Sequence, residues 1–427
     1  MLAIGSRFAR VEPRRRAGAF LRGLLAGLPR ANCWTIAEQA GQACPRGTQR
    51  LLSSAVVDTD GLRDDLRAYV VGHLGDPGAV LVIDETGDVK KGVKTVGVQR
   101  QYTGTAGRIE NSQVAVYLVY AATAGYAFID RELYLPRAWT GDPARCRAAG
   151  VPEDVGFATK PALGKAMITR ALDAGTPARW AAGDEVYGND PKLRAAIASR
   201  GLGFVVAVAK DHHIQTAAGV HEAAGLAALL PARAWQRLPA GDGAKGPRLY
   251  DWALVDTTDP ALPQDAQGAN WLLVRRSIPA RGDAAAEYAF YRAHAPGPVP
   301  LNVLVKVAGT RWKIEESFAG GKELAALDQH QVRGWTSWRR WTILAMLAHA
   351  FLSVMTATQP LPRDGICRDE NGRELIPLTR NEIRRLFTGL TCQPRPADHQ
   401  LRWSRWRRRH QATARRCHYR RREALTV

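Results

Sequence analysis

The sequence predicts an α/β protein, because short apolar runs typical of buried strands alternate with stretches of helical periodicity. The clearest run is Ala79-Val-Leu-Val-Ile83, which contains no polar residue and therefore predicts a strand buried on both faces. At 427 residues, the chain is long enough for two or three domains. Further strands are expected at 114–121, 126–135, 180–184 and 204–209, and helices at 160–174 and 193–200.

The segments around this core differ from it in character. Residues 1–75 are expected to be helical. Residues 211–303 are rich in glycine, proline and alanine, and they predict a β-rich insertion with strands near 249–255, 270–275 and 287–292. Helices return afterwards, the longest at 335–355. The predicted divisions are 1–75, 76–210, 211–303, 304–360 and a basic C-terminal region at 361–427.

Charge is the strongest compositional signal. The chain has 60 Lys and Arg residues against 40 Asp and Glu residues, which gives a formal net charge of +20. A protein this basic usually binds a polyanion, and nucleic acid is the first candidate. Residues 401–422 contain ten arginines. We interpret them as an arm that neutralises DNA phosphates, with a solvated, disordered tail as the equal alternative.

The cysteines and the apolar segments indicate a cytoplasmic protein that is not in a membrane. Six cysteines are scattered along the chain without a Cys-x-x-Cys pair, which favours free thiols in a reducing compartment over a zinc site. The most apolar stretch, residues 341–357, is short for a membrane span and follows a pair of arginines. We therefore expect it to be a buried core helix.

Three carboxylates are candidates for a catalytic site. Asp84 follows the first predicted strand, Asp184 follows a second, and Glu315 lies in a helical stretch. Ligands of open α/β sheets bind at strand ends. A carboxylate withdrawn from water there is tolerable when it binds a cation. Each aspartate could instead be an ordinary turn or cap residue.

Helix geometry adds two cations to this set. Successive residues of an α-helix are about 100° apart. Arg311, Glu315 and Lys322 therefore fall on one face of a predicted helix, and Glu316 points elsewhere. The alternative is a surface helix with an Arg311–Glu315 ion pair, which contributes only a few tenths of a kcal/mol.

The motifs around these residues resemble those of a known family, the DDE transposases of bacterial insertion sequences. The similarity runs from about residue 7 to residue 352, and it is closest to the branch with an RNase H-like core that carries a β-strand insertion between the second Asp and the Glu. The motifs are Val80-Leu-Val-Ile-Asp84-Glu-Thr-Gly87, Gly183-Asp184-Glu-Val-Tyr-Gly188 and Arg311-x-x-x-Glu315-x6-Lys322.

The resemblance implies a function and its partners. Asp84, Asp184 and Glu315 would be the catalytic residues and would hold two Mg²⁺ ions, with Mn²⁺ as a possible substitute. The enzyme would cut the ends of an insertion sequence and join them to target DNA. Its partners would be the terminal inverted repeats, the target DNA and a second copy in a synaptic complex, near the bacterial nucleoid. Ala308 stands where the family often has Tyr, so a hairpin intermediate is not implied.

Several basic residues are expected to contact DNA. Arg311 and Lys322 would bind phosphates beside the scissile bond, and Lys90, Lys91 and Arg100 would line the DNA nearby. Sequence reading is expected from the N-terminal helices, where residues 36–52 have the spacing of a helix-turn-helix. That pair would place Thr48, Gln49 and Arg50 in a major groove. The insertion at 211–303 is the alternative reader.

Other functions remain open at this stage. A glycoside hydrolase also uses paired carboxylates, but the charge of +20 does not favour it. The chain could be a catalytically idle repressor derived from a transposase, or a host RNase H-like nuclease without end specificity.

Overall fold

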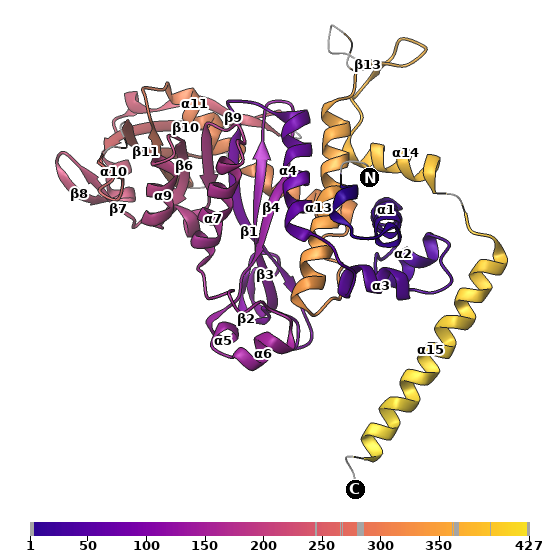
Figure 1. Cartoon of the computed structure of the whole chain (residues 1–427). Coiled ribbons are helices and arrows are strands. Elements are labelled where there is room, and N and C mark those ends of the chain that lie inside the picture. Colours follow the sequence, from indigo (N-terminus) through magenta and orange to yellow (C-terminus); the bar gives the residue numbers. More distant parts are fainter. Residues whose placement is uncertain are drawn as a thin grey trace. The chain divides into compact units, whose positions relative to one another are not determined.

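The computed structural model in Figure 1 describes residues 4–243, 246–264, 266, 268–279, 286–360, 362, 367–392 and 394–424. The chain folds into two compact units. One unit is Leu66–Ala319, and the other combines Met1–Asp65 with Gly320–Val427. The predicted division into five segments stays a prediction.

A large mixed sheet forms the centre of unit Leu66–Ala319. Its strand order is β2-β3-β1-β5-β6-β12-β11-β10-β9, and β4 pairs with β3. The pairs β1–β5 and β5–β6 are parallel, and the others are antiparallel. The mixed α/β class predicted from the sequence is confirmed. The strands are β1 (Val80–Val89), β2 (Gln99–Thr103), β3 (Arg108–Ala121), β4 (Tyr126–Leu133), β5 (Trp180–Gly183), β6 (Gly203–Val208), β9 (Gln236–Gly243), β10 (Gly246–Thr257), β11 (Ala269–Arg276) and β12 (Tyr288–Ala295).

Strand β1 is longer than predicted. The apolar run ends at Ile83, but the strand continues to Val89 because β3 remains paired with it as far as Val89↔Ser112. Its parallel pairing with β5 ends at Ile83↔Gly183. Asp84 therefore lies inside β1, although it comes directly after the part of β1 that is flanked on both sides. The prediction that Asp84 follows the strand was wrong, because the end of hydrophobicity was taken for the end of pairing.

Helices of this unit pack closely on the sheet. Gly164 of α7 lies so near the sheet that a Cβ there would be 1.9 Å from Ile83 Cδ1. The helices are α5 (Arg137–Thr140), α6 (Pro143–Ala148), α7 (Lys160–Asp173), α8 (Glu185–Gly188), α9 (Pro191–Ala198), α10 (Ala223–Ala228) and α11 (Leu301–Thr310), followed by α12 (Trp312–Ala325), which crosses the boundary between the units.

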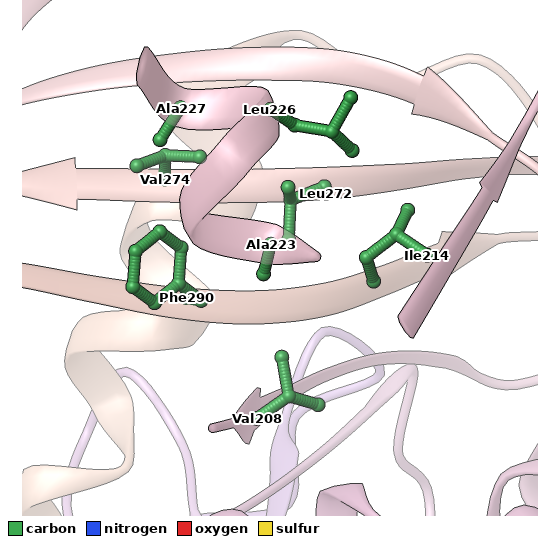
Figure 2. Close-up of a cluster of buried hydrophobic side chains, with 8 residues drawn as sticks. All are labelled: Val208, Ile214, Ala223, Leu226, Ala227, Leu272, Val274 and Phe290. Carbon is green, nitrogen blue, oxygen red and sulfur yellow. The ribbon is translucent and has the colours of Figure 1, made fainter. Parts of the chain in front are cut away.

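The segment between β6 and α11 extends the sheet. The three strands expected there are present as β10, β11 and β12, while the hairpin β7 (His213–Thr216) and β8 (Gly219–Glu222), strand β9 and helix α10 were not predicted. Figure 2 shows how α10 packs over β11 and β12 through Leu226, Leu272 and Phe290, with Val208 at the end of β6. This buried cluster joins the added strands to the rest of the sheet.

The other unit is mainly helical. Phe20 of α1 meets Trp341 of α13 edge to face at 5.3 Å between ring centroids, in the interior of this unit. Of the described helices, α13 is the one long and apolar enough to cross a membrane, and 72% of its most apolar window is buried within the protein. The elements are α1 (Val11–Leu25), α2 (Cys33–Gln39), α3 (Arg46–Ser53), the start of α4 (Thr59–Leu74), α13 (Trp335–Ala357), β13 (Cys367–Arg368), β14 (Glu374–Leu375), α14 (Arg380–Thr391) and α15 (Ala397–Glu423).

The arginine-rich C-terminal stretch is a helix. Helix α15 has 27 residues and is longer than α13, which has 23. The alternative of a disordered tail was therefore wrong for the described residues. The expectation that α13 is the longest helix was also wrong. The last residues of the predicted basic region, 425–427, lie outside the described part of the chain.

The close contact of α8 with β6 gives a prediction about stability. A Cβ at Gly188 would lie 1.8 Å from the backbone carbonyl oxygen of Ala207, so Gly188→Ala is expected to destabilise the protein by about 1–3 kcal/mol. Gly225→Ala is the matched control, since Gly225 is also helical and no atom lies within 4 Å of its added Cβ. Urea unfolding measures both variants. Equal unfolding free energies would contradict the packing described here.

Candidate active site

Asp84 and Asp184 come together where the parallel pairing of β1 with β5 ends. Ile83 and Gly183 are the last register partners of the two strands, and the next residue in the chain is Asp84 within β1 in one case and Asp184 just after β5 in the other. Asp84 is only 7% exposed. Asp184 caps helix α8 by accepting a hydrogen bond from the backbone N–H of Val186 at 2.9 Å.

A cation and a third carboxylate complete the group. Arg311 Nη1 lies 3.4 Å from Asp84 Oδ2 and 3.7 Å from Glu315 Oε1. The sequence predicted that Arg311 and Glu315 belong to one helix, but Arg311 is not part of the helix that carries Glu315. It lies at the break between α11 and α12. Its backbone is still helical, with φ −51° and ψ −35°, so the expected i,i+4 approach to Glu315 is retained.

The predicted companions of Glu315 lie in different places. Lys322 is on the part of α12 that belongs to the mainly helical unit, whose second segment begins at Gly320. Glu316 points away from Arg311, because it accepts a hydrogen bond from the Tyr126 hydroxyl and pairs with Lys313 at 3.1 Å. Glu315 is therefore the glutamate that faces Asp84.

The electrostatics of the site favour a bound cation. Burial, followed by the nearby charges of Asp184, Glu85 and Glu315, raises the pKa of Asp84 well above its usual range, and Arg311 only partly offsets this. Burial and then the charge of Glu85 raise the pKa of Asp184. Both shifts disfavour the ionised carboxylates, first through loss of hydration and then through neighbouring negative charge.

The donor set suits a hard divalent cation, since carboxylate oxygens are the ligands that Mg²⁺ and Mn²⁺ prefer. Among the described residues, no three His, Cys, Asp or Glu side chains are close enough together to hold a metal ion as they stand. Arg311 lies between Asp84 and Glu315 instead. The chemistry of the residues fits a metal, and the position of a cation between two carboxylates is taken by the guanidinium.

A second group of side chains supports the aspartates from the other face of β1. Side chains alternate along a strand, so Glu85 points away from Asp84. Tyr187 Oη donates to Glu85 Oε2 at 2.6 Å, and Lys160 Nζ lies 2.5 Å from Glu85 Oε1. Tyr187 belongs to α8, the helix that Asp184 caps. Glu85 therefore ties the strand that carries Asp84 to the helix that begins at Asp184.

Sequence reasoning missed this support. The only signal was that Glu85 and Tyr187 lie within the two acidic motifs. Nothing in the sequence pairs a glutamate with a tyrosine 102 positions away.

The predicted DNA-binding residues near the site are at the surface for the most part. Lys91 and Arg100 are exposed, and Lys90 lies 3.7 Å from Asp88. In the helical unit, Gln49 and Arg50 of α3 are exposed. Thr48 is fully buried and donates its hydroxyl proton within the protein, toward the carbonyl oxygens of Pro45 and Cys33. The prediction that Thr48 reads bases was wrong.

Fold and site together define an α/β protein with an acidic centre where the parallel pairing of two strands ends, in which Asp84 is buried. A family model described as "DDE superfamily endonuclease" matches residues 6–225, which is more than half of the chain. The protein therefore belongs to the DDE superfamily of endonucleases. The matched segment contains Asp84 and Asp184, and Glu315 lies beyond it.

A curated relative makes the family resemblance more specific. The chain is 29% identical over 195 residues to the "Probable transposase for insertion sequence element IS701" of Microchaete diplosiphon. The alignment covers 45% of this chain and 48% of that protein, so the chain spans about half the length of this relative. The resemblance to the transposases of insertion sequences is confirmed.

The support from Glu85 leads to a prediction. Tyr187→Phe removes the hydroxyl group that Glu85 accepts from and leaves a partly buried carboxylate with one partner fewer, at a cost of about 1–3 kcal/mol. Tyr102→Phe is the matched control, because Tyr102 is 63% exposed and should tolerate the change. Chemical unfolding of both variants gives the comparison. If they unfold alike, the Tyr187–Glu85 bond does not hold the site together.

Proposed function

We propose that the protein is a transposase that cuts and joins the ends of an insertion sequence by metal-dependent phosphodiester hydrolysis and strand transfer. The observation that carries the proposal is the position of Asp84 and Asp184 where the parallel pairing of β1 with β5 ends, with Arg311 and Glu315 beside them, in a DDE superfamily endonuclease. The name of the curated relative also supports it.

The proposal assigns an RNase H-like core within the large sheet. Strands β1, β3, β4, β5 and β6 would form this core, because they adjoin one another and two of them lead to the aspartates. Residues between β6 and α11 would be the β-rich insertion, since their strands are added beyond β6 at one side of the sheet. This arrangement places the insertion between Asp184 and Glu315 in the sequence.

Asp84, Asp184 and Glu315 would hold two Mg²⁺ ions, with Mn²⁺ as a substitute. When bound, such ions activate the attacking oxygen and stabilise the leaving oxygen of a phosphodiester. The protein's own part is to keep the carboxylates close and Asp84 withdrawn from water. In the absence of ions, Arg311 partly neutralises Asp84 and Glu315. With DNA bound, Arg311 would turn to a phosphate and release both carboxylates.

The DNA would be double-stranded and would include terminal inverted repeats and target sequence. Lys90, Lys91 and Arg100 would contact its backbone near the acidic centre, and Lys322 would do so further along α12. Arg50 on α3 is exposed and would contribute to reading the ends. A homodimer would hold two ends in a synaptic complex in the cytoplasm, near the nucleoid.

The catalytic assignment is tested by single substitutions. Asp84→Ala, Asp184→Ala and Glu315→Ala are each expected to reduce Mg²⁺-dependent nicking of a plasmid with the gene's flanking DNA on the order of 10³-fold. DNA binding should persist, because the phosphate contacts come from other residues.

Glu316→Ala is the control, since it changes the same side chain one position along α12, where Glu316 pairs with Lys313 and Tyr126. It should cleave within a few-fold of the wild type. Near-normal cleavage by any of the first three variants would remove that residue from the site.

A further inference from the structure

Helix α15 is fastened to α2 along its first part. Trp403 Nε1 donates to the carbonyl oxygen of Gln42 at 2.7 Å, and His399 Nε2 lies 2.9 Å from the carbonyl oxygen of Glu38. Arg407 forms an ion pair with the Glu38 side chain. Two of these contacts are to carbonyl oxygens at and just beyond the C-terminal end of α2, and the third is to a side chain of the same helix.

Aromatic packing completes this anchor. The Trp34 ring of α2 meets Trp406 at 4.9 Å and His410 at 5.0 Å, both edge to face. Trp406 and His410 stack on each other at 5.2 Å, and Trp403 is 1% exposed. The anchor is therefore a small core that fixes the direction of α15 relative to α2.

Beyond the anchor, α15 lies in solvent. Every residue from 411 to 422 is exposed except Ala414, which is half-buried. The segment contains Arg415, Arg416 and Arg420 and no acidic residue. Like charges four residues apart, such as Arg416 and Arg420, destabilise a helix, so a bound polyanion would stabilise this one. In Figure 1, α15 is the long yellow helix that ends at the C-terminus.

Eight of the ten arginines of α15 form two lines, and the other two, Arg407 and Arg421, are on the side of the anchor. At about 100° per residue, the first line falls within about 60° of the helix circumference and the second lies about 100° away from it. The second line is opposite the anchor residues Trp403, Trp406 and His410, and the first line is about 100° around the helix from them. All eight arginines are exposed. The first line consists of Arg402, Arg405, Arg409, Arg416 and Arg420, and the second of Arg408, Arg415 and Arg422.

This geometry fits the major groove of double-stranded DNA. The groove is about 12 Å wide and admits an α-helix, and the two phosphate backbones that border it face two sides of such a helix. Guanidinium groups bind phosphates with paired hydrogen bonds. An anionic membrane fits poorly, because residues 411–422 have no apolar stripe to insert.

We infer that α15 lies along a major groove, with one line of arginines on each backbone, and that the anchor on α2 holds it there as a fixed arm. The inference rests on the proposed function for its partner, DNA. The arginines of α15 are not residues of the acidic centre, so binding can be measured without cleavage.

The test is equilibrium binding of the full chain to a labelled duplex about three helical turns long, in EDTA and over a range of KCl concentrations. Arg409→Gln, Arg416→Gln and Arg420→Gln together should weaken binding roughly 10- to 100-fold at 0.1 M salt and reduce the slope of log K against log salt by about 2–3. Glutamine keeps the helix propensity of arginine. Because EDTA excludes cleavage, the result does not depend on whether the chain is a transposase.

The matched control removes three equally exposed arginines from outside α15: Arg147, Arg233 and Arg373, each changed to Gln. It lowers the net charge by the same amount and should change the slope by less than about one. If the two triple variants bind alike, α15 is not a DNA-binding arm. Loss of binding to phosphatidylserine vesicles with DNA binding unchanged would also overturn the inference, in favour of a membrane surface.

Two further comparisons test the anchor and the groove. Trp406→Ala leaves every charge in place, so the salt slope should persist while affinity falls on the order of 5-fold, because the arm is no longer preorganised.

A duplex whose major groove is blocked by glucosylated hydroxymethylcytosine should bind the wild type more weakly than the unmodified duplex does. The α15 triple variant should bind the two duplexes equally. An equal effect of the blocked groove on both proteins would overturn the placement in the groove.

Discussion

Asp84 is withdrawn from water beside the half-buried Asp184, where the parallel pairing of β1 with β5 ends, and the surrounding structure is arranged around the cost of that burial. An ionised carboxylate in such a place must be paired, or it must bind a proton or a cation. The raised pKa of Asp84, which burial causes before any neighbouring charge, expresses that cost. Arg311 offsets this cost only in part.

The neighbouring elements keep this arrangement in place. On one face of β1, the guanidinium of Arg311 forms an ion pair with Asp84. On the other face, Glu85 joins β1 to α8 through a hydrogen bond from Tyr187, and it forms an ion pair with Lys160. Glu85 itself raises the pKa of Asp184 by its negative charge, and Lys160 pairs with that charge.

The sequence allowed part of this to be predicted. Apolar runs that end in an aspartate located Asp84 and Asp184, and i,i+4 spacing related Arg311 to Glu315, because both are local patterns. The Glu85–Tyr187 bond was not predictable, since it depends on strand register and on which face a side chain occupies. Thr48 was misassigned because its burial follows from the packing of helices, which the sequence does not display.

The C-terminal helix was missed for a related reason. Its arginines gave no apolar stripe, and helix prediction from sequence relies mainly on that stripe. What fixes its first part is a tertiary contact between Trp34 and Trp406, residues far apart in the sequence. Its charge led to the prediction of a DNA-binding segment, which stays a prediction, and the two lines of arginines become apparent only once the residues are placed on a helix.

The central claim is that the acidic centre is a cation site in which Arg311 takes the place of a metal ion. Calorimetric titration of Mn²⁺ into the DNA-free protein tests it most directly, with the wild type compared with Arg311→Gln and with Asp184→Asn. If the account is right, Arg311→Gln binds Mn²⁺ more tightly than the wild type, because a competing cation has been removed, and Asp184→Asn binds it more weakly. Unchanged or weaker binding by Arg311→Gln would contradict it.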